Sequence, residues 1–265
     1  MLAYRDARGG AEVAFTDRHG GVSAGPYASL NLGYGVGDDV SAVDRNVALA
    51  VAAFTDADPR ARLTGLRQVH GADVHLVGGK DDRAAEAVRS SSTPHAPGPP
   101  RWPTADALVT TEPGTVLLVR AADCVPVLLA ALSADGAAVA AVHAGRSGLV
   151  EGVVTRAVTR LRALVPERSA DIVAWIGPHV CGACYEVPAG MRDDVAAVVP
   201  QARATTSWGT ASLDLGAGVV AQLRASGVDD IVDARRCTRE DDDLFSYRRQ
   251  GAASGRLGGL VWIRP

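Results

Sequence analysis

The chain has 265 residues, of which 47% are hydrophobic and 22% are charged, and its formal net charge is -3. This composition is typical of a globular protein and excludes a disordered chain, a collagen and a coiled coil. Because the sequence also lacks a basic bias, an apolar stretch of about 18 residues and a signal-peptide core, we expect a cytoplasmic protein without nucleic-acid or membrane partners.

The first part of the chain predicts short strands around one helix. Residues 11–15 have the composition of a strand, and the glycine-containing segment 16–23 follows as a turn. Apolar residues recur at helical spacing over 44–54, which predicts a helix, and 73–77 predicts another short strand. Proline, serine and glycine dominate 89–101, so we expect a flexible loop there rather than a linker between domains.

The remainder of the chain is predicted to contribute most of the sheet. Its strand candidates are short, continuous apolar runs, and runs without alternation predict strands that are buried on both faces. Helices and strands follow one another without regular βα alternation, which favours a single α+β domain over residues 1–265. The predicted strands are 115–120, 125–131, 137–142, 171–176, 231–233 and 260–263, and the predicted helices are 147–165 and 213–225.

Three potential metal ligands stand next to apolar segments: His70, Cys124 and His143. Two imidazoles and a thiolate suit zinc, and three protein ligands leave a fourth position for water or substrate. Asp123 could orient one imidazole through a hydrogen bond. The spacing alone does not establish a metal site, because a buried cysteine is also a common apolar filler and a Cys–His pair can act as a nucleophile without metal.

The segment from Cys181 to Cys184 has the C-x-x-C form. A redox pair of this form is expected at the start of a helix after a strand, whereas this one lies in a loop rich in glycine and proline. One C-x-x-C without a second pair is weak evidence for zinc. We therefore expect these two cysteines to have a local role in the loop.

Five further polar residues are candidates for binding a substrate. Arg18 lies in a glycine-containing turn and Arg248 near the C-terminus, and either guanidinium could hold an anion. Ser29, Asn31 and Gln68 stand among apolar neighbours, where they are either turn-formers or substrate contacts. The chain contains neither a dinucleotide-binding nor a P-loop glycine motif, so these residues do not belong to a known phosphate loop.

A series of longer segments, in a fixed order, resembles the YfiH-like family. Members of that family are also described as laccase-domain or polyphenol oxidase proteins and as purine nucleoside phosphorylases. Each segment alone is a weak signal, but their combination is specific. The matching segments are FTDRHGGVS (15–23), PYASLNLG (26–33), GDDVSAVDRN (37–46), RQVHGADV (67–74), TADALVTT (104–111), AADCVPVLLA (121–130), VHAGRSGLVEGVV (142–154), IGPHVCGACYEV (176–187), RRCT (235–238), LFSYRRQG (244–251) and SGRLGGLVWI (254–263).

The resemblance implies a fold, a metal site and an activity. The implied fold is a single α+β domain with β-sheets packed between helices, similar to the catalytic domain of cytotoxic necrotizing factor toxins. The family's zinc ligands fall on His70, Cys124 and His143, which makes them the candidate catalytic residues. The implied activity is phosphorolysis of adenosine, inosine, guanosine and methylthioadenosine, with deamination of adenosine in some members. The sequence departs from the family at Arg146, where a tryptophan usually follows His-Ala-Gly.

Other activities remain open alternatives from the sequence. Known zinc deaminases carry an H-x-E and P-C-x-x-C signature that this chain lacks, so deamination would need another base, such as Asp73 or Asp123. A cytosolic Cys/His hydrolase or amidase that edits peptidoglycan precursors would use the same residues. Copper is the alternative metal, because histidine and cysteine bind it tightly, and it would allow polyphenol oxidation. We expect the partners to be a nucleoside and phosphate, and the chain to be a monomer or a weak dimer.

Overall fold

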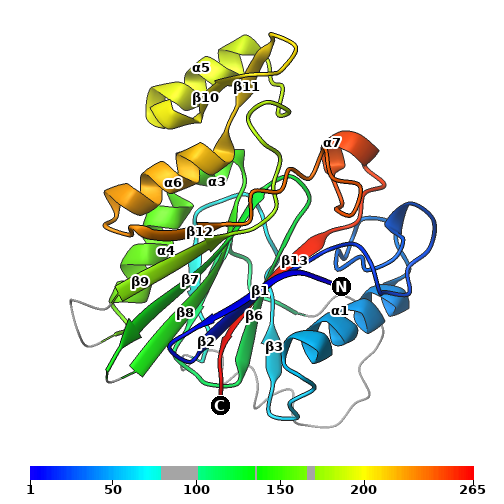
Figure 1. Cartoon of the computed structure of the whole chain (residues 1–265), viewed down its shortest axis with the longest axis vertical. Helices are drawn as coiled ribbons and strands as arrows, with labels where there is room; N and C mark the ends of the chain where they lie inside the picture. Colours follow the sequence, from blue (N-terminus) through cyan, green and yellow to red (C-terminus); the bar gives the residue numbers. More distant parts are fainter. Residues whose placement is uncertain (79–100, 135, 166–170) are drawn as a thin grey trace.

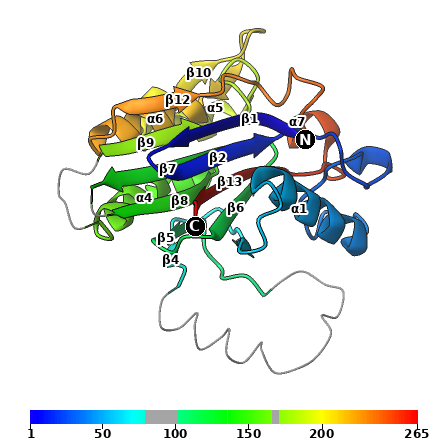
Figure 2. The same cartoon turned by 60° about the horizontal axis from the view of Figure 1, so that its bottom comes forward.

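The protein, described here by a computed structural model, has a mixed α+β fold in which two β-sheets pack face to face between helices (Figure 1 and Figure 2). The structure describes residues 1–78, 101–134, 136–165 and 171–265. One sheet has the strand order β12 (Asp230–Asp233), β9 (Asp171–Ile176), β7 (Val125–Ser133), β8 (Gly136–Ala144), β5 (Ala107–Thr110) and β4 (Val74–Leu76). The other has the order β1 (Leu2–Arg8), β2 (Ala11–Thr16), β13 (Leu257–Ile263), β6 (Thr115–Ala121) and β3 (Arg62–Thr64).

Three layers of apolar contacts hold the sheets and helices together. Between the sheets, Phe15 meets side chains such as Leu128 and Trp175, all nearly inaccessible to solvent. The outer face of the six-stranded sheet packs on α4 (Val153–Arg162) and α6 (Leu215–Ala225). Helix α1 (Val40–Phe54) covers the outer face of the five-stranded sheet. Both faces of the central strands are therefore buried, as their continuous apolar sequences predicted.

Two helices differ from their predicted extents, for identifiable local reasons. Helix α1 (Val40–Phe54) begins before residue 44, because the Asp39 side chain accepts hydrogen bonds from the first backbone N–H groups and caps it. The helix predicted over 147–165 is two helices, α3 (Arg146–Val150) and α4. Gly152 separates them with a φ of 80°, a left-handed conformation that a continuous helix cannot contain.

The prediction for the later helix over 213–225 is confirmed with a small shift. Asp214 caps α6 by accepting a hydrogen bond from the backbone N–H of Ala217, and Gly227 follows its end with a φ of 70°. Several elements were not predicted: β1, η1 (Gly25–Tyr27), β3, β5, α5 (Ala189–Val198), η2 (Pro200–Ala202), β10 (Arg203–Thr205), β11 (Ala211–Leu213) and α7 (Tyr247–Gln250). Strand β1 was missed because it lies at a sheet edge and carries polar residues, which give it no apolar run.

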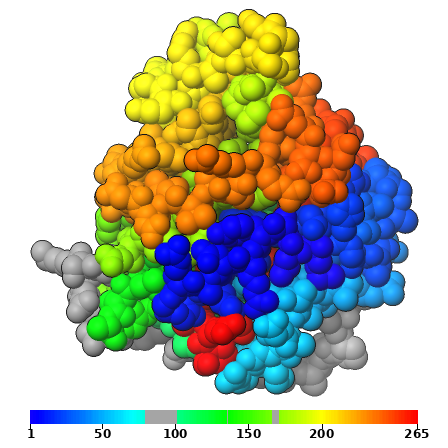
Figure 3. Space-filling view, viewed as in Figure 1, coloured from blue at the N-terminus to red at the C-terminus, as the bar shows by residue number. Residues whose placement is uncertain are grey.

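The segment around β12 crosses the surface between two parts of the molecule. In Figure 3 its orange residues lie between the yellow residues of α5, β10 and β11 and the blue N-terminal strands. The loop predicted near 89–101 lies, up to residue 100, outside the described residues. Among the described helices, none is both long enough and apolar enough to cross a membrane.

Candidate functional site

Strand pairing brings the three predicted metal ligands together at one end of the six-stranded sheet. Cys124 immediately precedes β7, and His143 is near the end of β8, which runs antiparallel to β7 with Pro126 opposite His143. His70 lies in the loop before β4. The ligand atoms of the three residues are within 4.8 Å of one another, and Cys124 Sγ is 3.7 Å from His70 Nε2. Residues that are 54 and 19 positions apart in sequence thus share one site.

A buried carboxylate, Asp106, holds both histidines in position. It stands directly before β5 and has no exposed surface. Its side chain accepts a hydrogen bond of 2.8 Å from His143 Nδ1, and it also accepts the backbone N–H groups of Val69, His70 and Gly71. Because Nδ1 of His143 donates to the carboxylate, the lone pair on its Nε2 is available to bind a metal or to accept a hydrogen bond.

The prediction that Asp123 orients an imidazole was therefore wrong. Asp123 uses its two carboxylate oxygens elsewhere: Oδ1 accepts from the Thr238 hydroxyl at 2.6 Å, and Oδ2 accepts from the backbone N–H of Arg248 at 2.6 Å. Asp106 was missed because its neighbours in the sequence do not distinguish it from the other aspartates of the chain. Only the pairing of β5 with β8 shows that it faces His143.

Glycine at position 145 leaves the space in which the three side chains meet. A Cβ atom there would lie 2.5 Å from Cδ2 of His70 and 3.3 Å from Sγ of Cys124. His70 itself has a φ of 60°, a left-handed conformation that is uncommon for a residue other than glycine. Its backbone N–H donates to Asp106, which helps to hold this conformation.

The local charges favour a thiolate in the site. Burial alone would raise the pKa of the Cys124 thiol, but the attraction of His143 and His70 outweighs it and lowers that pKa to about 6. Burial likewise opposes the charged form of His143, whereas Cys124 and Asp106 raise its pKa to about 9. Burial would also raise the pKa of Asp106, but hydrogen bonds from His143 and the backbone lower it. Without metal, the site therefore favours an ion pair between thiolate and imidazolium.

Two cavities reach this group of residues. The smaller has a volume of about 500 Å³, and the larger about 680 Å³, and both are lined by His70 and Cys124. The smaller is further lined by Asp123, Arg146, Ser147, Val180, Tyr185, Leu215, Tyr247 and Arg248. The larger includes His143, Gln68, Tyr34, Trp102, Arg101, Arg120 and Arg256 in its wall.

Of the five predicted substrate contacts, the structure places Arg248 and Gln68 at these cavities. Arg248 lies over the Tyr185 ring, with its guanidinium carbon 4.7 Å from the ring centroid. Gln68 lines the larger cavity, but its amide group already pairs with the backbone of Arg120 through hydrogen bonds of 2.7 and 2.9 Å. The side chain of Gln68 therefore builds the wall of the cavity.

The other three lie in a separate hydrogen-bonded turn and line neither cavity. Arg18 donates through Nε to the Ala28 carbonyl oxygen, and the Ser29 hydroxyl donates to the carbonyl oxygen of Arg18. Asn31 is fully buried, and its side chain bonds the backbone of Gly33 and the carboxylate of Asp38. Their role as substrate contacts remains a prediction. Their positions away from both cavities do not support it.

Sequence reasoning also missed several residues that line the cavities. Burial lowers the pKa of Arg120 to about 10, and its guanidinium carbon lies 4.8 Å from the centroid of Trp102 and 5.6 Å from that of Tyr34. Tyr185 and Tyr247 line the smaller cavity. No motif marks these aromatic residues, because they come from separate segments and meet only in the folded chain.

The donor set of the site fits a transition-metal ion. Two imidazole nitrogens and one sulfur lie close enough to share an ion, and the backbone at Gly145 leaves room between them. Histidine and cysteine are ligands for both zinc and copper. The site would leave a coordination position open towards the cavities, since no fourth His, Cys, Asp or Glu side chain joins this group within the described residues.

The chain is similar to known proteins over nearly its whole length. A family model described as "Multi-copper polyphenol oxidoreductase laccase" matches residues 12–264. A protein of Streptomyces coelicolor named purine nucleoside phosphorylase is 50% identical over 263 residues, covering 99% of this chain and 100% of the relative. A protein of the same name from Mycobacterium tuberculosis is 44% identical over 248 residues, covering 94% of this chain and 90% of the relative.

Solved structures of related proteins have the same fold. YlmD from Geobacillus stearothermophilus superposes with a TM-score of 0.80 at 33% identity, covering 99% of this chain and 98% of that one. A Neisseria meningitidis protein superposes with a TM-score of 0.79 at 32% identity, covering 100% of this chain and 99% of that one. The similarity extends over nearly the whole chain in both cases.

Proposed function

This chain belongs to the laccase-like YfiH family, and from that premise we propose that it cleaves purine nucleosides with phosphate at the site formed by His70, Cys124 and His143. Relatives named purine nucleoside phosphorylase, similar along nearly their whole length, support the reaction class. The observation that carries the proposal is that two cavities meet at this site. Phosphorolysis brings two substrates together, because a phosphate oxygen must reach the ribose carbon that carries the base, and two cavities at one site give each substrate a place.

The smaller cavity is the better place for phosphate. Within the described chain, the guanidinium groups of Arg146 and Arg248 form no hydrogen bond or ion pair, although the Arg248 group stacks on Tyr185. Arginine binds phosphate oxygens in pairs, so two such groups on one cavity suit a dianion. Arg146 stands where the resemblance leads us to expect tryptophan, so this chain adds a positive charge at the phosphate side.

The larger cavity is suited to the nucleoside. Arg120 and Arg256 are already engaged there, because each donates to backbone carbonyl oxygens. Trp102 and Tyr34 contribute aromatic surface, on which a purine base can stack. The base would lie in this cavity with its ribose directed towards His70 and Cys124.

The proposed reaction exchanges one bond for another at the ribose. A phosphate oxygen forms a bond to C1′ of the ribose, the bond between C1′ and the purine nitrogen breaks, and its electron pair leaves with the base. The base gains the proton that the attacking hydrogen phosphate gives up, and ribose 1-phosphate is the other product. The arginines of the smaller cavity orient phosphate and balance its charge, while the walls of the larger cavity hold the base in place.

Zinc is the proposed metal of the site. His70, Cys124 and His143 would hold it, with the Asp106 carboxylate orienting His143. When bound, such an ion polarises a coordinated oxygen and lowers the pKa of coordinated water. Adenosine, inosine, guanosine and methylthioadenosine are the proposed substrates. Deamination of adenosine would be a second activity, for which Asp123 is better placed than Asp73 because only Asp123 lines the smaller cavity.

The experiment is a chromatographic assay of adenosine with zinc-loaded protein, with and without phosphate. We expect adenine and ribose 1-phosphate only with phosphate, and no product from Cys124→Ala. Arg248→Ala should raise the KM for phosphate about 10- to 100-fold, the usual effect of losing a charged hydrogen bond. Arg45→Ala, an exposed arginine on α1, is the matched control and should leave the KM unchanged.

Other outcomes would point to other chemistry. Adenine and free ribose without phosphate would indicate a hydrolase and overturn the proposal. Inosine in the same chromatogram would show deamination in addition. If adenosine, inosine, guanosine and methylthioadenosine are all left unconsumed, nucleosides are not the substrates, and amides from cell-wall precursors and copper-dependent phenol oxidation become the next assays.

A further inference from the structure

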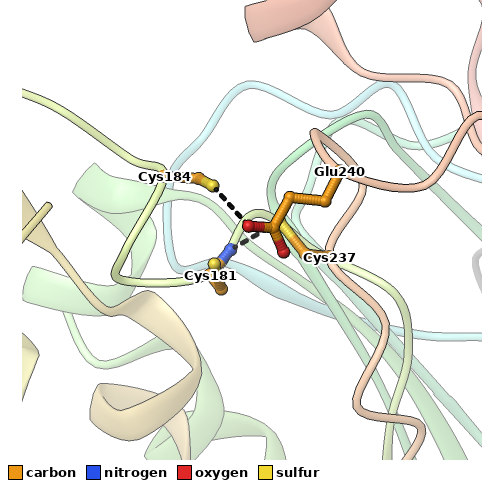
Figure 4. A group of neighbouring side chains, drawn as sticks. All are labelled: Cys181, Cys184, Cys237 and Glu240. Carbon is orange, nitrogen blue, oxygen red and sulfur yellow. Dashed lines mark hydrogen bonds between the residues drawn. The ribbon is translucent and has the colours of Figure 1, made fainter. Parts of the chain in front are cut away.

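We propose that the chain has a second metal site, in which Cys181, Cys184, Cys237 and Glu240 hold one zinc ion. The four potential ligand atoms lie within 4.8 Å of one another. Figure 4 shows that their side chains point towards one another from two separate loops. This group shares no residue with the site formed by His70, Cys124 and His143, so the proposal does not depend on the proposed phosphorolysis.

The two loops present their ligands in the same way. The Cys184 N–H donates to the Cys181 carbonyl oxygen at 3.0 Å, which closes a turn with a ligand at each end. The Glu240 N–H donates to the Cys237 carbonyl oxygen at 3.2 Å, so the sequence C-x-x-E forms a second turn of the same spacing. In zinc sites built from pairs of ligands, each pair commonly comes from one such short turn. The fourth ligand position was missed in the sequence because it is Glu240 and not a cysteine.

Backbone contacts fix the two turns against each other. His179 and Cys237 form an isolated β-bridge, and the Thr238 N–H donates to the His179 carbonyl oxygen at 3.0 Å. The Cys181 N–H donates to the sulfur of Cys237 at 3.4 Å, a contact that stabilises negative charge on that sulfur. The two loops thus already hold the ligands together without an ion.

The side chain of Arg249 stabilises the second turn through hydrogen bonds to its backbone. One guanidinium nitrogen of Arg249 donates to three carbonyl oxygens, those of Thr238, Arg239 and Asp241, at 2.7 to 3.0 Å. These contacts hold the backbone on both sides of Glu240. A rigid backbone lowers the entropy that the protein loses when the ligands close on an ion.

The chemistry of the four ligands selects the metal. Three sulfurs and one carboxylate oxygen give a set of four, and zinc in structural sites takes four ligands in a tetrahedron. With Zn–S bonds of about 2.3 Å, sulfurs in a tetrahedron lie about 3.8 Å apart, which needs only small movements from the present spacing. Calcium and magnesium prefer oxygen ligands, so neither fits this group.

The position of the second site gives it a structural role next to the first. Thr238 lies between its two ligands Cys237 and Glu240, and its hydroxyl donates to Asp123 at 2.6 Å. Asp123 precedes Cys124 and accepts the backbone N–H of Arg248. An ion in the second site would therefore stabilise the turn that supports the wall of the smaller cavity. It would not itself contact the substrates.

The test is a metal count combined with cobalt spectroscopy on the full chain. Zinc-loaded wild-type protein should contain two zinc ions per chain, and both Cys124→Ser and Cys237→Ser should contain one. Cobalt(II) in place of zinc gives an absorption band from each Co–S bond. Three of the four cysteines belong to the second site, so Cys124→Ser should keep about three-quarters of the band and Cys237→Ser about one-quarter.

Glu240→Gln keeps all three sulfurs and serves as the milder variant if Cys237→Ser does not fold. We expect it to release its second zinc ion to a chelator at least 10-fold faster than wild type, with circular dichroism confirming a folded chain. One zinc ion per wild-type chain, retained by Cys237→Ser and lost by Cys124→Ser, would overturn the proposal. A disulfide among Cys181, Cys184 and Cys237 in freshly purified wild-type protein, detected by mass spectrometry, would also overturn it.

Discussion

At the scale of single residues, the site depends on a few groups with several contacts each. Asp106 receives three backbone N–H groups and one imidazole, so one carboxylate fixes both the loop of His70 and the ring of His143. Gly145 contributes by its lack of a side chain, because any Cβ would enter the space between His70 and Cys124. The positions of the three candidate ligands therefore depend on Asp106 and Gly145, which are not themselves candidate ligands.

Replacing Asp106 with asparagine tests how far orientation of the histidines matters. We expect zinc affinity at the first site to fall about 10- to 100-fold, the usual effect of losing a carboxylate that orients a metal-bound histidine. Competition with a zinc chelator measures the change. Asp73→Asn is the control, because that side chain is exposed and lines another surface pocket. Equal affinities for the two variants would show that Asp106 does not orient a ligand.

The reactivity of Cys124 provides a test of the site's electrostatics. Its pKa of about 6 means that the thiolate is the main form in the metal-free protein at neutral pH and is lost as the pH falls through 6. An ordinary cysteine has a pKa of about 8.5, so it would lose its thiolate at a pH about two units higher than Cys124 does. Alkylation at Cys124, followed by mass spectrometry of its peptide, should therefore remain fast at pH 7 and slow below pH 6. A midpoint near 8.5 would contradict the attraction by His143.

The raised pKa values of two other cysteines provide an internal reference for that experiment. Cys181 and Cys184 should react slowly at pH 7 in the same metal-free sample. Because all peptides come from one digest, differences in reagent or protein concentration cancel. The ratio of modified Cys124 to modified Cys181 at each pH is the quantity to report.

At the scale of elements, strand ends and the start of a helix place the site residues. The antiparallel pairing of β8 with β7 and β5 brings the end of β8 to the beginnings of its two neighbours, where His143, Cys124 and Asp106 lie. The next element, α3, begins directly after Gly145, and Arg146 faces the smaller cavity from its first turn. The chain then breaks at Gly152, and α4 continues beyond it.

Substitution of Gly152 tests the cost of that break. Alanine should lower the free energy of unfolding by about 1 to 2 kcal/mol, because the left-handed conformation at a φ of 80° is unfavourable for it. A Cβ atom at this position meets nothing within 4 Å, so backbone strain is the only cost in the structure. Asparagine tolerates this conformation better and should cost less. Urea unfolding of both variants measures the difference, and equal losses would contradict the conformational explanation.

At the scale of the whole molecule, two sheets in face-to-face contact provide the rigid base of the site. Side chains of both sheets, such as Phe15, Leu128 and Trp175, fill the layer between them. The Trp175 ring nitrogen also donates to Asp6 of β1 at 2.9 Å, which joins the edge of one sheet to the other. Because each sheet is covered by helices on its outer face, the central strands cannot shift without exposing apolar surface.

The contribution of this layer can be measured with one truncation. Leu128→Ala should lower the free energy of unfolding by about 2 to 5 kcal/mol, because Leu128 is fully buried between the sheets and its loss leaves a cavity. Leu49→Ala, on the exposed side of α1 with 38% of its surface accessible, should change it by less than about 0.5 kcal/mol. Similar losses in the two variants would show that the layer between the sheets does not dominate stability.

The sequence by itself determined the features that depend on neighbouring residues. Continuous apolar runs predicted the buried strands β7, β8 and β9, and Asp214 and Gly227 marked the two ends of α6. The same local reasoning failed at Gly152, where one residue with a positive φ divides a helix whose apolar pattern continues on both sides. It also missed β1, because a polar edge strand carries no apolar signal.

Only the tertiary structure decided which distant residues meet. The residue types of His70, Cys124 and His143 suggested a metal, and the family resemblance grouped them, but spacing alone could not. Their proximity follows from the register of β7 and β8 and from the Asp106 carboxylate, whose importance no motif marks. Likewise, the second turn that faces the C-x-x-C segment lies more than 50 residues further along the chain. Strand pairing and loop packing bring such residues together through contacts that are not local, and local periodicity contains no information about those contacts.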